Sequence, residues 1–335
     1  MSRKNDPISG HGGRIDAMAR AFPDAPLPWI DLSTGINPFF YPVPAITADA
    51  WHRLPGEAAR AECERSMADA FACGAAHCRA VAGTEGAIRQ LPAIHKAHTV
   101  AVRGQSYADH AESWRASGAR VIEVSDPLEL AGRADVVVIV NPNNPDGRGW
   151  PIDQIEHARA RLAGRGGLLI VDEAYADIDP FHSVASLAGR KGLIVLRSFG
   201  KFYGLAGVRL GAVLAGPDVL GALDKKLGCW DVSGPALEIG TAAYADRQWQ
   251  KATRERLAVQ MQEMRGLIAT AGLVDVGGTD LFRFVRAENA PMLWRQLAES
   301  GIAVRRFVGD ALLHLRVGLP SDDAAFGRLA KALSP

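Results

Sequence analysis

The chain has almost no excess charge of either sign. Its 335 residues include 38 Lys and Arg against 37 Asp and Glu, which gives a formal net charge of +1. A protein that binds nucleic acid or an anionic membrane surface through a broad basic face would carry a clear positive excess. The composition therefore predicts no nucleic-acid partner and no membrane partner, and basic residues that matter should act locally.

Long hydrophobic runs are also missing. The longest apolar stretches, such as 136–140 and 168–171, are far shorter than the roughly 20 residues that a helix needs to cross a bilayer. The polar start at 1–13 lacks the apolar core of a signal peptide. We therefore expect a cytoplasmic protein.

Cysteine is scarce. The four cysteines are scattered along the chain, at Cys63, Cys73, Cys78 and Cys229. They are too few for a disulfide framework in a chain of this length, so reduced thiols are expected. Cys73, His77 and Cys78, with His95 nearby, are residue types that bind metals, but no C-x2-C pair or second ligand pair has zinc spacing. We predict no metal.

Two nucleotide-binding signatures are absent as well. The chain contains no Rossmann G-x-G-x-x-G, and Gly200-Lys201 is followed by Phe202 where a P-loop has Ser or Thr. What the chain does have is 48% hydrophobic and 22% charged residues. That is the composition of a globular protein long enough for one large core and a second, smaller one.

From about residue 79 to 216, short apolar runs alternate with helix-like segments. The predicted strands are 80–82, 99–102, 120–124, 135–140, 167–172, 193–197 and 210–215. This alternation predicts a mostly parallel sheet covered by helices. The runs 136–140, 168–171 and 193–196 are apolar throughout, as expected when both faces of a sheet are buried.

The remainder of the chain has a different pattern. A long helical pattern at 235–271 precedes strands near 273–276, 281–286, 302–306 and 312–317, with helices at 291–300 and 322–333. We therefore expect an α/β protein in three parts. These are an N-terminal arm at 1–30 associated with the small domain, a large domain at 31–225, and a small α+β domain at 226–335.

Four polar motifs follow predicted strands, where ligands of open α/β sheets bind. They are Gly83-Thr84-Glu85, Asn141-Pro142-Asn143-Asn144-Pro145-Asp146-Gly147, Asp172-Glu173-Ala174-Tyr175 and Ser198-Phe199-Gly200-Lys201. A lone lysine on such a turn is usually a solvated surface residue. Between Ser198 and Arg209, however, Lys201 could bind an aldehyde covalently while its neighbours hold an anion.

The other motifs fit a pyridinium ring with a phosphate. Asp172 could keep a ring nitrogen protonated or simply cap the next turn, and a buried carboxylate there implies a cationic partner. Asn144 and Tyr175 could donate to a ring oxygen, although an Asn-Pro turn is often only a loop and a tyrosine often only packs. The glycine turn at Gly83 opens a helix, whose exposed N–H groups suit a phosphate.

The order and spacing of these motifs resemble the fold type I family of pyridoxal-phosphate (PLP) enzymes, in the branch with histidinol-phosphate aminotransferase and threonine-phosphate decarboxylase. The resemblance covers nearly the whole chain. It implies a fold type I PLP-dependent transferase fold, pyridoxal 5'-phosphate as the cofactor, and a homodimer. The cofactor residues that it implies are Lys201 (covalent attachment), Asp172 (ring nitrogen), Asn144 and Tyr175 (ring oxygen), Tyr107 (ring stacking), and Thr84, Glu85, Ser198 and Arg209 (phosphate).

The same resemblance implies where a substrate would bind. Arg316 would bind a carboxylate, and Arg305 or Arg306 would add a second cation, which suits a small phosphorylated amino acid. His11-Gly12-Gly13 and Asp31-Leu32-Ser33-Thr34-Gly35-Ile36-Asn37-Pro38 look like the threonine-phosphate decarboxylases of cobalamin biosynthesis. Substrate residues implied by this match are His11, Gly35 and Asn37, together with Asn144.

Three functions stay open at this stage. The favoured one is PLP-dependent decarboxylation of L-threonine O-3-phosphate to (R)-1-aminopropan-2-yl phosphate. A histidinol-phosphate-type aminotransferase would use the same motif residues, but Phe39 stands where typical members have a tyrosine. An inert assembly protein with the same fold is the third, and the intact Lys201, Asp172 and Arg209 argue against it.

Overall fold

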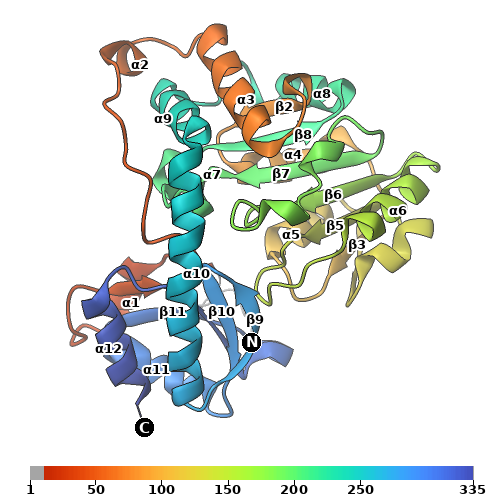
Figure 1. The fold of residues 1–335 in the computed structure, drawn as a ribbon. Helices are drawn as coiled ribbons and strands as arrows, with labels where there is room; N and C mark the ends of the chain where they lie inside the picture. Colours follow the sequence, from red (N-terminus) through yellow and green to blue (C-terminus); the bar gives the residue numbers. More distant parts are fainter. Residues whose placement is uncertain (1–10, 335) are drawn as a thin grey trace. The chain divides into compact units, whose positions relative to one another are not determined.

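The structure is a computed structural model that describes residues 11–334, and these form two compact units (Figure 1). The large unit contains Phe40–Asn144 and Arg148–Ala252. The small unit contains the described chain up to Phe39, the short stretch Pro145–Gly147 and the chain from Thr253 onward. The three-part division with boundaries at residues 30 and 225 stays a prediction.

The large unit is built on a seven-stranded sheet with the order β2-β8-β7-β6-β5-β3-β4. Its strands are β2 (Cys78–Val81), β3 (Thr99–Arg103), β4 (Arg120–Val124), β5 (Val136–Val140), β6 (Leu168–Asp172), β7 (Leu193–Ser198) and β8 (Gly211–Ala215). Six of them run in the same direction, and β8 runs antiparallel to both of its neighbours, β2 and β7. The mostly parallel sheet is therefore confirmed.

Helices cover this sheet because its central strands are apolar on both faces. The helices of the unit are α2 (Ala48–His52), α3 (Glu57–Phe71), α4 (Thr84–Ile94), α5 (Ala108–Ala116), α6 (Ile152–Ala163), α7 (Phe199–Phe202), α8 (Pro217–Leu227) and α9 (Gly234–Ala245). Residues of α4, α5 and α8 share one buried core with Val138, Ile170 and Leu196. Side chains alternate along a strand, so Asp172 and Ser198 project on this same face, at the carboxyl ends of β6 and β7.

The expected helix at 235–271 is two helices, and that prediction was wrong in this respect. Helix α9 ends at Ala245, and α10 (Arg247–Thr270) begins two residues later. Between them Asp246 has a non-helical ψ of 79°, and its carboxylate accepts a hydrogen bond from the Trp249 N–H at 2.9 Å. The aspartate thus caps the second helix, an arrangement that a continuous apolar period does not reveal.

The small unit has a five-stranded sheet with the order β1-β11-β12-β10-β9. Its strands are β1 (Ile30–Leu32), β9 (Val274–Thr279), β10 (Phe282–Arg286), β11 (Ile302–Arg306) and β12 (His314–Gly318), and its helices are α1 (Ile15–Ala21), α11 (Ala290–Glu299), α12 (Asp323–Leu333) and the later part of α10. Strand β1 is parallel to β11, while β12 is antiparallel to both β10 and β11. The small unit therefore has the α+β fold that the sequence predicts for the later part of the chain.

The paired glycines of the arm have a packing reason within this unit. A Cβ on Gly12 would lie 2.2 Å from the Ser33 carbonyl oxygen. Gly13, which has a φ of +80°, donates its N–H to Ser33 Oγ at 2.8 Å. Only glycine allows the backbone of the arm to approach the end of β1 this closely.

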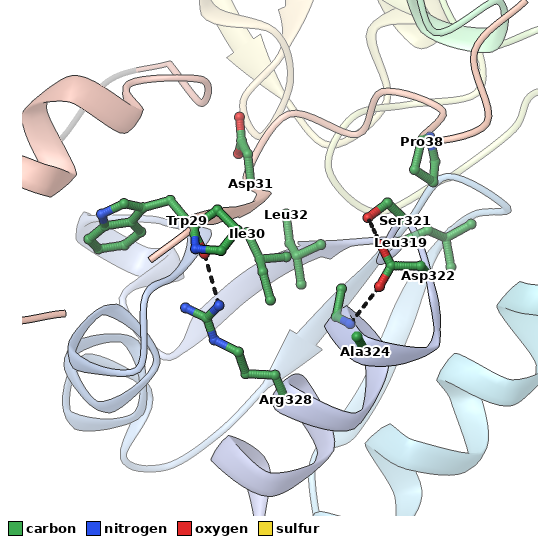
Figure 2. A pocket seen from close by; sticks show the side chains of 12 residues that line it. Trp29, Ile30, Asp31, Leu32, Pro38, Leu319, Ser321, Asp322, Ala324 and Arg328 are labelled. Carbon is green, nitrogen blue, oxygen red and sulfur yellow. Dashed lines mark hydrogen bonds between the residues drawn. The ribbon is translucent and has the colours of Figure 1, made fainter. Parts of the chain in front are cut away.

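A cavity of about 400 Å³ lies beside β1 and the start of α12, within the small unit (Figure 2). Its charged side chains are engaged by the fold. Arg328 donates to the Pro28 carbonyl at 2.8 Å and the Pro26 carbonyl at 2.7 Å, and it also bonds the Ser300 carbonyl. Asp322 accepts the Ala325 N–H at 2.8 Å and so caps α12. The polar groups of this cavity hold the arm and the helix in place.

One property holds for all described helices. Within residues 11–334, no helix combines the length and the apolar composition that a membrane span requires.

Candidate functional site

A second cavity, of about 140 Å³, lies in the large unit at the carboxyl ends of β5, β6 and β7. Every residue that the sequence assigned to the cofactor lines it. These residues are Thr84, Glu85, Tyr107, Asn144, Asp172, Tyr175, Ser198, Lys201 and Arg209. Residues up to 125 positions apart thus meet because parallel strands place their carboxyl ends at one edge of the sheet. Their individual roles stay a prediction.

Asp172 is the buried carboxylate of this cavity, with 3% of its surface exposed. Its Oδ2 lies 2.8 Å from Nε2 of His110, which is equally buried. Because a carboxylate only accepts hydrogen bonds, Nε2 of His110 carries the hydrogen and donates. The other oxygen accepts the Ala174 N–H at 3.1 Å, so Asp172 also caps the following turn. The cap is thus observed, and the role of Asp172 toward a ring nitrogen stays a prediction.

His110 is the residue that the sequence reasoning missed. A partner for Asp172 was implied, but none was identified. The signal was its place three residues after Tyr107, in the first turn of α5, which starts near the carboxyl end of β3. The Tyr107 and His110 rings make an edge-to-face contact, with centroids 6.1 Å apart.

Lys201 lies on α7, the short helix that directly follows β7. The neighbouring Phe199 and Phe202 are fully buried, and Phe199 stacks on Tyr203 with 4.6 Å between ring centroids. This aromatic packing holds the lysine's backbone, because buried rings have few alternative rotamers. The Nζ of Lys201 lies 5.8 Å from the Tyr175 ring centroid, on the cavity side.

The start of α4 and the Arg209 guanidinium form an anion cradle. Gly83 has a φ of +76°, and a Cβ on it would lie 2.6 Å from Nη2 of Arg209. The guanidinium therefore lies against the helix N-terminus, where backbone N–H groups lack partners within the helix. Arg209 itself has a left-handed backbone, with φ 55°. These positive groups, with Ser198 on the same wall, fit a phosphate dianion.

The asparagines of the Asn-Pro-Asn-Asn-Pro motif have different tasks. Asn141 accepts the Trp150 N–H at 3.1 Å, and Asn143 donates to the Gln105 carbonyl at 2.9 Å. These two hold the turn in shape. Asn144 is the one that lines the cavity.

The predicted substrate arginines lie in the small unit and are described there alone. Arg305 on β11 is directly opposite Arg316 on β12. Arg316 has 5% of its surface exposed and donates to the Ser33 carbonyl. Burial, followed by the charge of Arg316, lowers the pKa of Arg305 to about 10. No carboxylate among residues 11–334 forms an ion pair with Arg305, so this pair of cations suits an anionic ligand.

The other substrate candidates of the small unit are His11, Gly35 and Asn37, and their roles stay predictions. His11, Ser33, Arg305 and Arg306 line a small pocket of about 20 Å³. Gly35 and Asn37 do not line that pocket, and Asn37 Oδ1 accepts the Phe39 N–H at 2.8 Å. Of the two candidate arginines, Arg306 packs over the Trp294 ring at 4.3 Å and Arg305 lies 5.7 Å from the Phe307 ring centroid. Which of them binds an anion stays a prediction.

A lysine on the turn after a parallel strand, a buried carboxylate and an anion cradle together define the site of a PLP-dependent enzyme of fold type I. The class I and II aminotransferase family matches residues 67–333, and the chain belongs to this family. It is similar to the histidinol-phosphate aminotransferase of Sinorhizobium meliloti, solved in complex with pyridoxal-5'-phosphate. That structure matches with a TM-score of 0.82 and 22% identity, covering 99% of this chain and 97% of the other. The predicted fold is thereby confirmed.

Two curated relatives distinguish the branches of this family. The chain is 42% identical over 329 residues to the threonine-phosphate decarboxylase of Pseudomonas aeruginosa, which covers 96% of both chains. It is 30% identical over 193 residues to histidinol-phosphate aminotransferase 1 of Legionella pneumophila, covering 56% of this chain and 53% of the other. The similarity to the decarboxylase is thus higher and extends over nearly the whole chain.

Proposed function

We propose that this protein is a PLP-dependent threonine-phosphate decarboxylase, which converts L-threonine O-3-phosphate into 1-aminopropan-2-yl phosphate and carbon dioxide in cobalamin biosynthesis. The observation that carries the proposal is one cavity that joins Lys201, the buried Asp172 and the anion cradle at Arg209. The nearly full-length similarity to a protein named threonine-phosphate decarboxylase favours this reaction over transamination.

The residues present fit pyridoxal phosphate. The close approach of Arg209 to Gly83 leaves a cationic cradle at the start of α4, suited to the phosphate. Asp172 is a buried carboxylate suited to a protonated ring nitrogen, and Asn144 and Tyr175 lie on the same cavity wall for the ring oxygen. When bound, the cofactor supplies an electron sink conjugated to the substrate's Cα.

The chain's own groups then direct the reaction. His110 donates to Asp172 and keeps the carboxylate oriented, so that its negative charge stays at one place in the cavity. Lys201 is the amine on the cavity wall that we assign to proton transfer. As the bond between Cα and the carboxylate breaks and carbon dioxide leaves, the lysine Nζ donates a proton to Cα, which replaces the lost group.

The substrate's two anionic groups find suitable partners in the small unit. Arg305 and Arg316 are adjacent, and a guanidinium binds a carboxylate or phosphate through a two-point fork. A phosphorylated amino acid carries both of these groups. His11, in the pocket that also contains Arg305, adds a further donor.

Product analysis tests this function. The purified enzyme is incubated with threonine phosphate, and carbon dioxide release is measured beside the transamination of histidinol phosphate. Carbon dioxide release without transamination is expected. Transamination alone would establish the aminotransferase, and a native protein without the visible absorbance of bound cofactor would establish the inert alternative.

Two further properties belong to the proposal. We infer a homodimer, supported by the family resemblance and by the exposed apolar side chains of Phe40, Trp51 and Leu54 in the large unit. We also infer a cytoplasmic location, supported by the free cysteines Cys63, Cys73, Cys78 and Cys229. Light scattering of the purified protein tests the first inference, and fractionation of the native cells tests the second.

A further inference from the structure

The Tyr107 side chain is anchored at its hydroxyl end. Its O–H donates to Oε2 of Glu85 at 2.9 Å. Burial raises the pKa of Tyr107, and the nearby Asp109 and Glu85 carboxylates raise it further. The hydroxyl therefore stays protonated at neutral pH and can donate its hydrogen to Glu85.

Glu85 is in turn held by a cation. Its Oε1 accepts from Nε of Arg89 at 2.8 Å, one helical turn further along α4. Nη2 of the same Arg89 lies 3.5 Å from Oδ1 of the buried Asp109. Arg89 therefore joins the two carboxylates that surround the tyrosine hydroxyl, and it balances part of their charge.

The location of Glu85 makes this arrangement unusual. The residue lies in the first turn of α4, where the backbone N–H groups form the anion cradle. A carboxylate near a phosphate is unfavourable by charge alone. Its hydrogen bonds to Arg89 and Tyr107 engage both of its carboxylate oxygens. The side chain therefore binds the tyrosine, while the backbone N–H belongs to the cradle.

We propose that Glu85, Asp109 and Arg89 are positioning residues that hold the Tyr107 ring at a fixed orientation on the wall of the cofactor cavity. This inference rests on the proposed function, because the Tyr107 ring would in turn orient the pyridine ring of the cofactor. A fixed ring presents a flat face at a fixed tilt, whereas a tyrosine anchored only at Cα would rotate.

A double-mutant cycle on cofactor affinity tests the proposal. The holoenzymes of Tyr107→Phe, Glu85→Leu and the double variant are prepared, and the dissociation constant of pyridoxal phosphate is measured by fluorescence. Each single change should weaken binding by roughly three- to tenfold, and the double variant should be no weaker than either one, since both remove the same bond. Glu85→Gln, which keeps an acceptor, should restore most of the affinity.

The sign of the Glu85→Leu effect separates two roles. If Glu85 acted only as a negative charge near the phosphate, its removal would tighten cofactor binding. The visible circular dichroism of the bound cofactor should also fall in Tyr107→Phe and Glu85→Leu. Glu299→Leu is the matched control, because it breaks an arginine–glutamate pair at the same i,i+4 spacing in α11, and it should change neither readout.

The outcomes are distinct. Tighter binding in Glu85→Leu, or single effects that multiply in the double variant, would overturn the positioning role and leave the proposed function intact. A native protein that shows no visible cofactor band would overturn the proposed function and this inference together.

Discussion

The two cavities differ in how their polar groups are arranged, and this difference does not follow their volumes. The cavity beside β1 is about 400 Å³ and the one beside Lys201 is about 140 Å³. In the larger one, Arg328 and Asp322 are engaged by backbone groups of the fold. In the smaller one, the N–H groups that start α4, the Arg209 guanidinium and the Lys201 amine converge from separate strand ends. The two cavities therefore differ in whether their polar groups bind the fold itself or point together into the cavity.

The largest effect is expected at the lysine. Lys201→Ala removes the amine that attaches the cofactor and moves the proton, so kcat should fall by a factor of about 10³ or more. The visible absorbance of the bound cofactor should disappear with it. Thermal unfolding serves as the control, since the half-buried lysine contributes little to packing. A variant that keeps most of its activity would show that the smaller cavity is not the active site.

The second largest loss of activity is expected at Asp172. Asp172→Asn keeps the size of the side chain and the cap on the Ala174 N–H but removes the negative charge, so kcat should fall by roughly 10²-fold. His110→Ala leaves that charge in place and removes only the donor that orients it, so a drop of about tenfold is expected. Steady-state kinetics on threonine phosphate measure both. Equal losses in the two variants would show that the histidine does more than orient the carboxylate.

Arg305→Met should weaken substrate binding and stabilise the fold at once. Removing one of two anion ligands should raise KM by about 10- to 100-fold. The pKa of Arg305 is lower in the folded protein than in the unfolded chain. Between about pH 10 and the ordinary arginine pKa, the folded protein therefore binds fewer protons than the unfolded chain. The free energy of unfolding of the native enzyme should rise with pH in this window. The charge therefore costs stability at neutral pH.

Thermal unfolding of Arg305→Met without substrate measures this second effect, and the melting temperature should be equal to or above that of the native protein. Arg306→Met is the matched control at the next position, because Arg306 packs on Trp294. That variant should lose stability and change KM less. A large KM effect at Arg306 with none at Arg305 would reverse the choice between the two arginines.

The features visible in the sequence are those with local signals. Strand β5 is apolar throughout, and β6 is apolar up to its last residue, Asp172, because both faces of these strands are buried. The motif at the end of each strand is therefore placed at one sheet edge. His110 has only its place three residues after Tyr107 as a local signal, since its contact with Asp172 depends on how α5 packs on the sheet. The break between α9 and α10 at Asp246 is likewise not visible in the sequence. A capping residue ends one helix and starts the next without changing the spacing of the apolar residues.

Gly35 and Asn37 illustrate a different limit. Their motif matched that of the decarboxylases, Asn37 accepts the Phe39 N–H within its own turn, and their contact with a substrate stays a prediction. A motif identifies a family, and it does not separate residues that shape a loop from residues that touch a ligand. The same holds for Asn141 and Asn143, which hold their turn while Asn144 faces the cavity.

The smallest effect on activity is expected in the larger cavity. Arg328→Met removes charged hydrogen bonds to the Pro26, Pro28 and Ser300 carbonyls. Each of these bonds contributes about 1.5–3 kcal/mol in isolation, but they share one side chain, so a loss of about 2–4 kcal/mol in the free energy of unfolding is expected. Urea unfolding measures this loss, and kcat/KM at low temperature should stay within about twofold of native. If instead activity falls while stability is unchanged, the cavity beside β1 binds a ligand, and the contrast between the two cavities fails.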